Sequence, residues 1–353
     1  MTARDTIITL EHGPYRLREQ IGGSAYGVIW RAAAPHGRRD VAIKLVNEAQ
    51  MTQAQPLLRE RWIASAANEL AFLSSLQPWD ERHIVRLLDS GWHDGLPVLA
   101  LELLDGDLGK HMATLRKAAA PPPFARVLGW MAQLNQALSK VHQYGWRYLD
   151  LKPANVLIDA RTHTVKLADF GSNRQLDAGS LHSYAGTATW QAPEQFFPQP
   201  GGGYATGIHS DYFALGALFY FLATGGVHLR FGSACGVAYR EHQLAGAHVL
   251  RERHGGAIPP TLQAAEERRF LAAVGGAQAA PALALLRALL AADPARRPRH
   301  VLDISRALAA IGDAAHANDN DNAGQSADDA TALPVALHRA APSARAWRSA
   351  GAP

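Results

Sequence analysis

The sequence predicts an α+β fold of two lobes: a small antiparallel β-rich N-terminal lobe with one long helix, and a larger, mainly helical C-terminal lobe. Residues 15–103 contain short apolar runs typical of strands, interrupted by one helical stretch. Beyond Asp107, apolar residues recur at helical spacing. The strongest helical segments are 124–144, 210–224, 281–291 and 301–311. A chain of 353 residues, 48% hydrophobic and 19% charged, is long enough for both lobes.

The N-terminal lobe is expected to begin with a hairpin. Runs 15–21 and 27–33 flank a glycine-rich turn, and the mostly apolar run 39–46 follows as a third strand. In the next stretch, apolar residues recur at three- and four-residue steps, which predicts an amphipathic helix over 56–76 that ends before Pro78. Two further strands are predicted at 84–88 and 98–103.

Composition excludes several classes of protein. No apolar run reaches the roughly 18 residues of a membrane span, and the first residues lack the apolar core of a signal peptide. A single cysteine, Cys235, excludes an internal disulfide and fits a reducing compartment. The net charge of +4 is small and no Lys/Arg run stands out, so no nucleic-acid partner is expected. We expect a cytoplasmic protein.

The expected organisation is an N-terminal extension (1–14), a two-lobed domain (15–312) and a disordered low-complexity tail (313–353). Within the domain, the N-lobe covers 15–103, the hinge 102–107 and the C-lobe 108–312. The tail begins with almost no apolar residues and cannot offset the entropy of ordering. It is read as a solvated linker. The alternative is a docking segment for an unknown partner, anchored by Trp347.

Two motifs carry the chemistry. The first reads Asp-Leu-Lys-Pro-Ala-Asn from Asp150 to Asn155, and the second is Asp169-Phe170-Gly171. Asp150 can accept a hydroxyl proton, and Lys152 can neutralise a transferring phosphate. Asn155 and Asp169 can hold Mg²⁺ between phosphate oxygens. In order and spacing the motifs resemble those of the eukaryotic-type (Hanks-type) protein serine/threonine kinase family.

The resemblance extends to the nucleotide site. The stretch 21–29 looks like the family's glycine-rich loop, whose backbone N–H groups approach the phosphates; it contains Ile21, Gly22, Gly23, Ser24, Gly27 and Ile29. Ser24 stands where the family's second glycine is expected. Lys44, in Val-Ala-Ile-Lys, is implied to pair with the α- and β-phosphates.

That lysine needs a carboxylate, and the long helix offers Glu60 and Glu69. We choose Glu69, because the residues after it resemble those that follow the helix glutamate of the family. These are Leu73, Leu76 and an Ile-Val-Arg-Leu run that leads into the next strand. The resemblance further implies that the backbone groups of Glu102 and Leu104 form hydrogen bonds with adenine. It also implies that Leu101 is the gatekeeper residue of this site. The ring would lie between the side chains of Ile29, Ala42 and Leu157.

The catalytic loop departs from the family's His-Arg-Asp, because this chain has Tyr148-Leu149-Asp150. Tyr148 can replace the histidine as a packing element beneath Phe170. Leu149 cannot replace the arginine, which in many relatives pairs with a phosphate on the activation segment. We therefore expect that phosphorylation does not order the activation segment in the usual way. The exception would be that Arg174 or another cation takes the place of the missing guanidinium.

The second half resembles a kinase that acts on proteins. Thr187 lies in a Gly-Thr-Ala-Thr-Trp-Gln-Ala-Pro-Glu segment that ends at Glu194, and is expected to bond Asp150 and Lys152, an arrangement of Ser/Thr kinases. Asp211 is expected to cap a buried helix and bind the catalytic-loop backbone. Arg297 is the expected partner of Glu194.

The resemblance thus implies a protein serine/threonine kinase that uses ATP and Mg²⁺, with Mn²⁺ as a possible substitute, and acts on protein substrates. Two alternatives stay open. One is a pseudokinase that binds nucleotide or a partner without catalysis, and the other is a small-molecule kinase.

Overall fold

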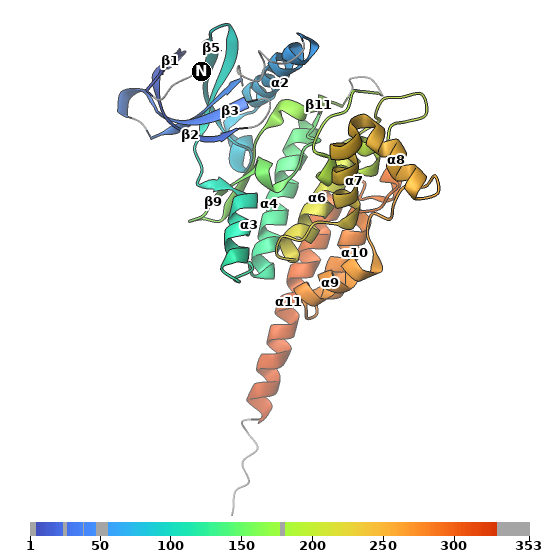
Figure 1. Cartoon of the computed structure of the whole chain (residues 1–353). Coiled ribbons are helices and arrows are strands. Elements are labelled where there is room, and N and C mark those ends of the chain that lie inside the picture. The colour runs from blue at the N-terminus through green and yellow to red at the C-terminus, as the bar shows by residue number, and fades with distance from the viewer. Residues whose placement is uncertain (1–4, 24–26, 38, 47–55, 177–180, 330–353) are drawn as a thin grey trace, which may run out of the picture.

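The computed structural model describes residues 5–23, 27–37, 39–46, 56–176 and 181–329. A β-rich lobe lies at one end of the molecule and a helical lobe at the other (Figure 1). This arrangement confirms the predicted α+β class, with its antiparallel N-terminal sheet and mainly helical C-terminal part. Among the helices of the described ranges, none has the length and apolar character that crossing a membrane requires.

The N-terminal sheet is antiparallel throughout, in the order β1-β2-β3-β4-β6-β5. Its strands are β1 (Ile7–Leu10), β2 (Gly13–Gly23), β3 (Gly27–Ala33), β4 (Val41–Val46), β5 (Leu87–His93) and β6 (Leu96–Glu102). Side chains alternate between the faces along β4. Ile43 joins a small outer core with Ile8 and Leu17, whereas Ala42 joins the main core toward the second lobe.

Helix α2 (Pro56–Ser75) connects the sheet to the helical lobe. Phe72 and Leu73 are buried at its C-terminal end and belong to the core that continues through the second lobe. The Phe72 ring stacks on Phe170 at a centroid distance of 4.5 Å. The position of α2 is therefore tied directly to the Asp-Phe-Gly motif.

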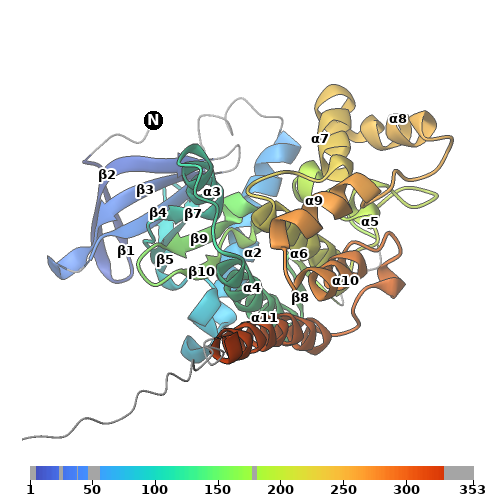
Figure 2. The ribbon, with the colours of Figure 1, turned by 90° about the horizontal axis from the view of Figure 1, so that it is seen from below.

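The C-terminal lobe is built around helix α6 (Ile208–Ala223), in which every residue from Ser210 to Leu222 is buried. A helix that is apolar on all sides must lie inside the protein. Helix α11 packs along α4, as Figures 1 and 2 both show. The other helices of this lobe besides α6 are α3 (Leu108–Lys117), α4 (Phe124–Gln143), α5 (Pro193–Phe196), α7 (Arg230–His242), α8 (Gly246–Arg253), α9 (Ala264–Val274), α10 (Ala279–Leu289) and α11 (Val301–Asp329). Helices α4, α9 and α10 pack on α6.

Two small sheets hold the loops between the lobes. Strands β7 (Gly106–Asp107), β9 (Val156–Asp159) and β10 (Thr164–Leu167) form one in the order β10-β9-β7. Strand β8 (Trp146–Arg147) pairs with β11 (Arg174–Gln175) to form the other. The catalytic loop runs from β8 to β9, and the Asp-Phe-Gly motif lies between β10 and β11. Both motifs are therefore fixed at each end.

One strand differs from its expected bounds: the strand expected at 84–88 begins only at Leu87, since Ile84 forms an isolated bridge to Leu167. Strand β1 lies within the stretch expected to be an N-terminal extension and pairs with β2, and Ile8 and Leu10 bury their side chains against the sheet. Helix α11 continues to Asp329, beyond residue 313. The expected domain bounds stay predictions.

Candidate active site

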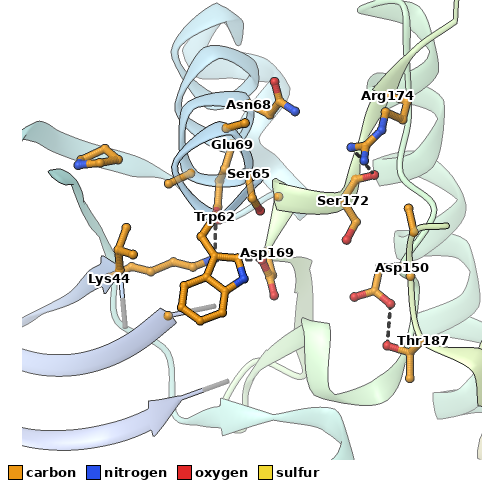
Figure 3. Close-up of a pocket in the computed structure, with 18 of the residues that line it drawn as sticks. Lys44, Trp62, Ser65, Asn68, Glu69, Asp150, Asp169, Ser172, Arg174 and Thr187 are labelled. Atoms are coloured by element: carbon orange, nitrogen blue, oxygen red, sulfur yellow. Dashed lines mark hydrogen bonds and ion pairs between the residues drawn. The ribbon is translucent and has the colours of Figure 1, made fainter. Parts of the chain in front are cut away.

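A cavity of about 350 Å³ lies between β4, α2, the catalytic loop and residues 183–187. Figure 3 shows Lys44, Glu69 and Asp169 converging on one side of it and Asp150 facing Thr187 on the other. Elements from both lobes thus enclose one polar cavity. None of the described candidates for adenine contact, such as Ala42 or Leu157, lines it, so the cavity does not include the candidate adenine site.

Lys44 makes two ion pairs, with Nζ 2.6 Å from Glu69 Oε2 and 2.8 Å from Asp169 Oδ1. Glu69, and not the exposed Glu60, is therefore its partner on α2. Burial disfavours the charged form of Lys44, but Asp169 and Glu69 outweigh it and hold the pKa of Lys44 above its ordinary value. Burial is also the main reason that the pKa of Glu69 is raised.

The candidate adenine-binding residues share a face of the sheet. Ile29 lies opposite Lys44 in the β3–β4 ladder, and Leu101 lies opposite Ala42 in the β4–β6 ladder. Residues paired in this way point to the same side, and Ala42 is two residues from Lys44. Leu157 lies on β9, which pairs with β7 at the end of the hinge. The structure thus places Ile29, Ala42 and Leu101 on one face of the N-terminal sheet, and Leu157 on a separate small sheet.

The ends of the glycine-rich loop and the hinge complete this region. Ile21, Gly22 and Gly23 end β2 and Gly27 begins β3, while Ser24 lies outside the described residues. At the hinge, the Glu102 side chain accepts bonds from Lys166 Nζ at 2.5 Å and from Arg86 N at 2.8 Å. Leu104 lies two residues beyond the end of β6. The side chain of Glu102 therefore points into a local network, and the adenine contacts of its backbone stay a prediction.

Asp150 lies at the centre of a hydrogen-bond network. Its Oδ2 accepts from Lys152 Nζ at 2.8 Å and from Asn155 Nδ2 at 2.9 Å, and its Oδ1 accepts from Thr187 Oγ1 at 2.8 Å. Lys152 Nζ also donates to Thr187 Oγ1 at 2.7 Å. Burial raises the pKa of Asp150, against the opposing effect of Lys152. A raised pKa makes this carboxylate a better proton acceptor.

The chemistry of Asn155 and Asp169 fits a Mg²⁺ ion. Asn155 uses its Nδ2 on Asp150, so its amide oxygen faces away from that residue and is available as a ligand. The side chain of Asp169 is 43% exposed. Burial alone would raise the pKa of Asp169, but the charge of Lys44 has the larger effect in the other direction, so the pKa of Asp169 is lowered. The described residues contain no group of three His, Cys, Asp or Glu side chains placed for a metal. Two ligands are enough where phosphate oxygens supply others, as is usual for Mg²⁺.

The Asp-Phe-Gly motif is held by packing. Asp169 has a left-handed backbone (φ 59°), which an aspartate tolerates better than most residues. Phe170 is fully buried between Phe72 and Tyr148, and its ring meets the Tyr148 ring edge-on at 5.2 Å. Tyr148 donates its hydroxyl proton to the Ala168 carbonyl. A side chain on Gly171 would collide with Ser65 on α2.

Leu149 also has a left-handed backbone (φ 65°), which is strained for a bulky residue. The Asp211 carboxylate holds it: Oδ2 accepts from Tyr148 N at 2.9 Å and Oδ1 from Leu149 N at 2.7 Å. The prediction that Asp211 caps α6 is wrong, because the helix begins at Ile208 after Gly207 and places Asp211 within the first turn. Its oxygens are directed at the catalytic loop instead of the helix end.

Glu194 and Arg297 form a bidentate pair with N–O distances of 2.7 and 2.9 Å. Arg297 Nε and Nη1 also donate to the carbonyl oxygens of Ala291 and His209, both at 2.8 Å. This pair joins α5 and the start of α6 to the segment before α11.

Sequence reasoning missed several residues that line or support the cavity. Trp62 and Ser65 line it from α2. They precede Glu69 by two turns and one turn of the helix, so helical spacing from Glu69 would have found them. Gln195 donates from Nε2 to the Leu149 carbonyl at 2.9 Å. No pattern in the sequence marks Gln195, because its partner is a backbone atom far away in the chain.

The chain belongs to the protein kinase family: the model of the protein kinase domain matches residues 15–307. It is similar to serine/threonine-protein kinase PknE of Mycobacterium tuberculosis, with 31% identity over 221 residues, or 61% of this chain and 35% of that protein. It is also similar to serine/threonine-protein kinase pkn2 of Myxococcus xanthus, with 27% identity over 317 residues, or 88% of this chain and 34% of that protein. The chain therefore spans about a third of the length of these relatives.

Gly186→Ala tests how closely residues 183–187 must approach the catalytic loop. Gly186 has φ +96°, and an added Cβ would lie 2.5 Å from the Leu149 carbonyl oxygen. We expect a loss of about 1–3 kcal/mol in stability from backbone strain alone, together with lower activity because Thr187 is displaced. Gly255→Ala is the control, since it has φ +65° and open space around the added Cβ. Equal activity losses in both variants would contradict the role of this approach.

Proposed function

We propose that this protein is a serine/threonine kinase that transfers the γ-phosphate of ATP to hydroxyl groups of protein substrates. Protein kinases use ATP and act on proteins as a family; the proposal is that this chain does so on Ser and Thr. One observation carries it: Asp150, Lys152 and Thr187 form a closed hydrogen-bond network next to Lys44, Glu69 and Asp169.

In the proposed reaction Asp150 orients the acceptor hydroxyl and takes its proton. The hydroxyl oxygen forms a bond to the γ-phosphorus as the bond to the β–γ bridging oxygen breaks, and ADP leaves. Lys152 lies 2.8 Å from Asp150, so its charge is placed to stabilise the transferring phosphoryl group. Lys44 holds the α- and β-phosphates and is itself held by Glu69. A Mg²⁺ ion bound by Asn155 and Asp169 would neutralise charge on the phosphate oxygens.

Transfer of label from [γ-³²P]ATP to a generic acceptor protein, followed by phosphoamino-acid analysis, tests the proposal. We expect label on Ser or Thr with the wild-type protein and none with Lys44→Met. Nucleotide binding without transfer would instead indicate a pseudokinase. Label found only in small acceptors would indicate a small-molecule kinase. Either result would contradict the proposal.

The pH dependence of kcat/KM reports on Asp150. Because burial raises the pKa of Asp150 and the charged form accepts the proton, activity should be present above that pKa and fall as the pH drops through it. The hydrogen bond from Thr187 lowers this pKa, so Thr187→Val should move the acid limb to higher pH. The lost bond to a charged group should reduce the rate roughly ten- to hundred-fold. Both proteins are measured with the same ATP, so the titration of ATP itself cancels. An unmoved limb would mean that another group controls it.

A further inference from the structure

A second cavity, of about 310 Å³, adjoins the candidate active site at Lys152, which lines both cavities. The two residues that follow Lys152 in the catalytic loop form part of its wall. Trp190 forms another part and comes three residues after Thr187, whose hydroxyl donates to Asp150. Neighbouring residues of an extended chain are only about 3.3 Å apart. A polypeptide that places a hydroxyl group at Asp150 can therefore place a nearby side chain in this cavity.

Much of the cavity wall consists of apolar side chains, among them Met112 of α3, Phe221 of α6 and Trp190. All three are buried. The ring of Trp190 meets the ring of Phe221 edge-on at 5.3 Å, and the His228 ring lies 5.0 Å from the first and 5.1 Å from the second. Rings that pack against one another hold each other in place. The shape of the cavity is therefore fixed by the core of the helical lobe.

The cavity carries positive charge and, among its described lining residues, no Asp or Glu. Its two cations are Arg116 and Lys152. Lys152 is already held by two partners in the catalytic-loop network. Arg116 makes no ion pair with the described residues, whereas Lys110, six residues earlier in the same helix, pairs with Asp107. Of the two described cations, Arg116 is therefore the one available to a ligand.

Arg116 extends from α3 toward the end of α6. Its Nη1 lies 3.6 Å from the point that a Cβ on Gly226 would occupy, and the Phe221 ring lies 3.7 Å from the same point. The pKa of His228 is lowered by partial burial and further by the charge of Arg116, so the histidine is neutral at neutral pH and adds no charge. Arg116 itself is exposed. Its guanidinium thus stands at the solvent edge of an apolar cavity.

We propose that this cavity binds an acidic side chain of the protein substrate close to the acceptor hydroxyl, and that Arg116 determines this specificity. The CH₂ groups of a glutamate would lie on the apolar wall, and its carboxylate would accept two hydrogen bonds from the guanidinium, the geometry that arginine favours. A lysine or arginine at the same place would meet a like charge and no carboxylate among the described lining residues. Such a repulsive contact rejects the wrong partner.

This inference rests on the proposed kinase function and adds the class of substrate to it: Ser or Thr hydroxyls in an acidic stretch of polypeptide. Its first test is therefore binding without phosphoryl transfer. Fluorescent peptides with Ala in place of the acceptor carry one Glu, moved step by step along an otherwise uncharged sequence, and a matched set carries Lys. Fluorescence anisotropy with the full chain gives the dissociation constants. At one position, or at two adjacent ones, we expect the Glu peptide to bind roughly fivefold more tightly than the Lys peptide.

Variants of two neighbouring residues make this result specific. Arg116→Glu should reverse the preference at the same position, and Arg116→Gln should abolish it. Lys117→Glu is the matched control, because Lys117 is the next residue of α3, is also exposed and lies outside the described cavity lining. It changes the net charge and the charge at the helix end equally. The control should keep the wild-type preference. No preference in the wild type, or an equal change in both Glu variants, would overturn the proposal.

The second experiment repeats the comparison with Ser as acceptor and with Mg·ATP. Glu should raise kcat/KM at the position found by binding. For that peptide, Arg116→Glu should raise KM with little change in kcat, because the contact is the same in the ground state and the transition state. Transfer that is equally fast with Glu and Lys at this position would contradict the assigned specificity. If no peptide is phosphorylated, the proposed function fails, while the binding comparison still decides whether Arg116 selects acidic chains.

Discussion

Asp169→Asn is expected to lower the rate of phosphoryl transfer by roughly 10³-fold or more, the effect of losing a charge that neutralises the transferring phosphate. The Asp169 side chain is 43% exposed, and its pKa is lowered by Lys44, so it is fully ionised at neutral pH. Asparagine retains the shape of the side chain and tolerates the left-handed backbone at this position. The substitution therefore removes the charge with little disturbance of the fold, whereas alanine would add strain.

Asp150→Asn serves as the comparison. It removes the proton acceptor but not the candidate metal ligand, so a smaller loss of roughly 10²–10⁴ is expected. Initial rates with a protein acceptor measure both variants, and thermal unfolding checks that each remains folded. The two variants should also differ in Mg²⁺ dependence, because only Asp169→Asn changes a candidate metal ligand, from a charged carboxylate to a neutral amide. Near-normal transfer by Asp169→Asn would show that the assigned mechanism is wrong.

The lobes and the motif residues could be predicted from the sequence because their signals are local. Alternation and helical spacing predicted the sheet, α2 and the long helices, and the fold class is confirmed. The catalytic-loop residues are contiguous, so their identities and spacing indicated a shared site before any geometry was known. Glu69 was chosen over Glu60 because of the residues that come after it in the chain, and the structure places it on Lys44.

The features that the sequence did not reveal depend on contacts between distant segments. Strand β1 has only four residues, too few for a periodic pattern, and its identity comes from pairing with β2. The facing of Arg147 and Arg174 results from the register of two very short strands, which no local pattern specifies. The resemblance implied that Asp211 binds the catalytic-loop backbone, and the hydrogen bonds agree. Only the folded chain shows that α6 begins earlier, at Ile208, so that Asp211 is not its cap.

Arg297→Met is expected to reduce the free energy of unfolding by about 3–5 kcal/mol, the usual cost of breaking a buried ion pair. The Arg297 side chain is fully buried, and the side chain of Glu194 is only 10% exposed. Without its partner, the Glu194 carboxylate would be left charged and poorly solvated. The carbonyl oxygens of Ala291 and His209 would also lose their donors. Urea unfolding of the full chain measures the effect.

Two comparisons separate the stranded carboxylate from the loss of packing. In the double variant Arg297→Met/Glu194→Gln no charge remains buried, so it should regain part of the lost stability, and a double-mutant cycle gives the coupling. The matched control is Arg287→Met, because Arg287 binds Glu267 through two bonds of 2.7 Å but has a side chain that is 58% exposed. Solvent screens that pair, so its loss should change stability far less. If both arginine variants lost equal stability, burial would not be what makes the Glu194–Arg297 pair strong.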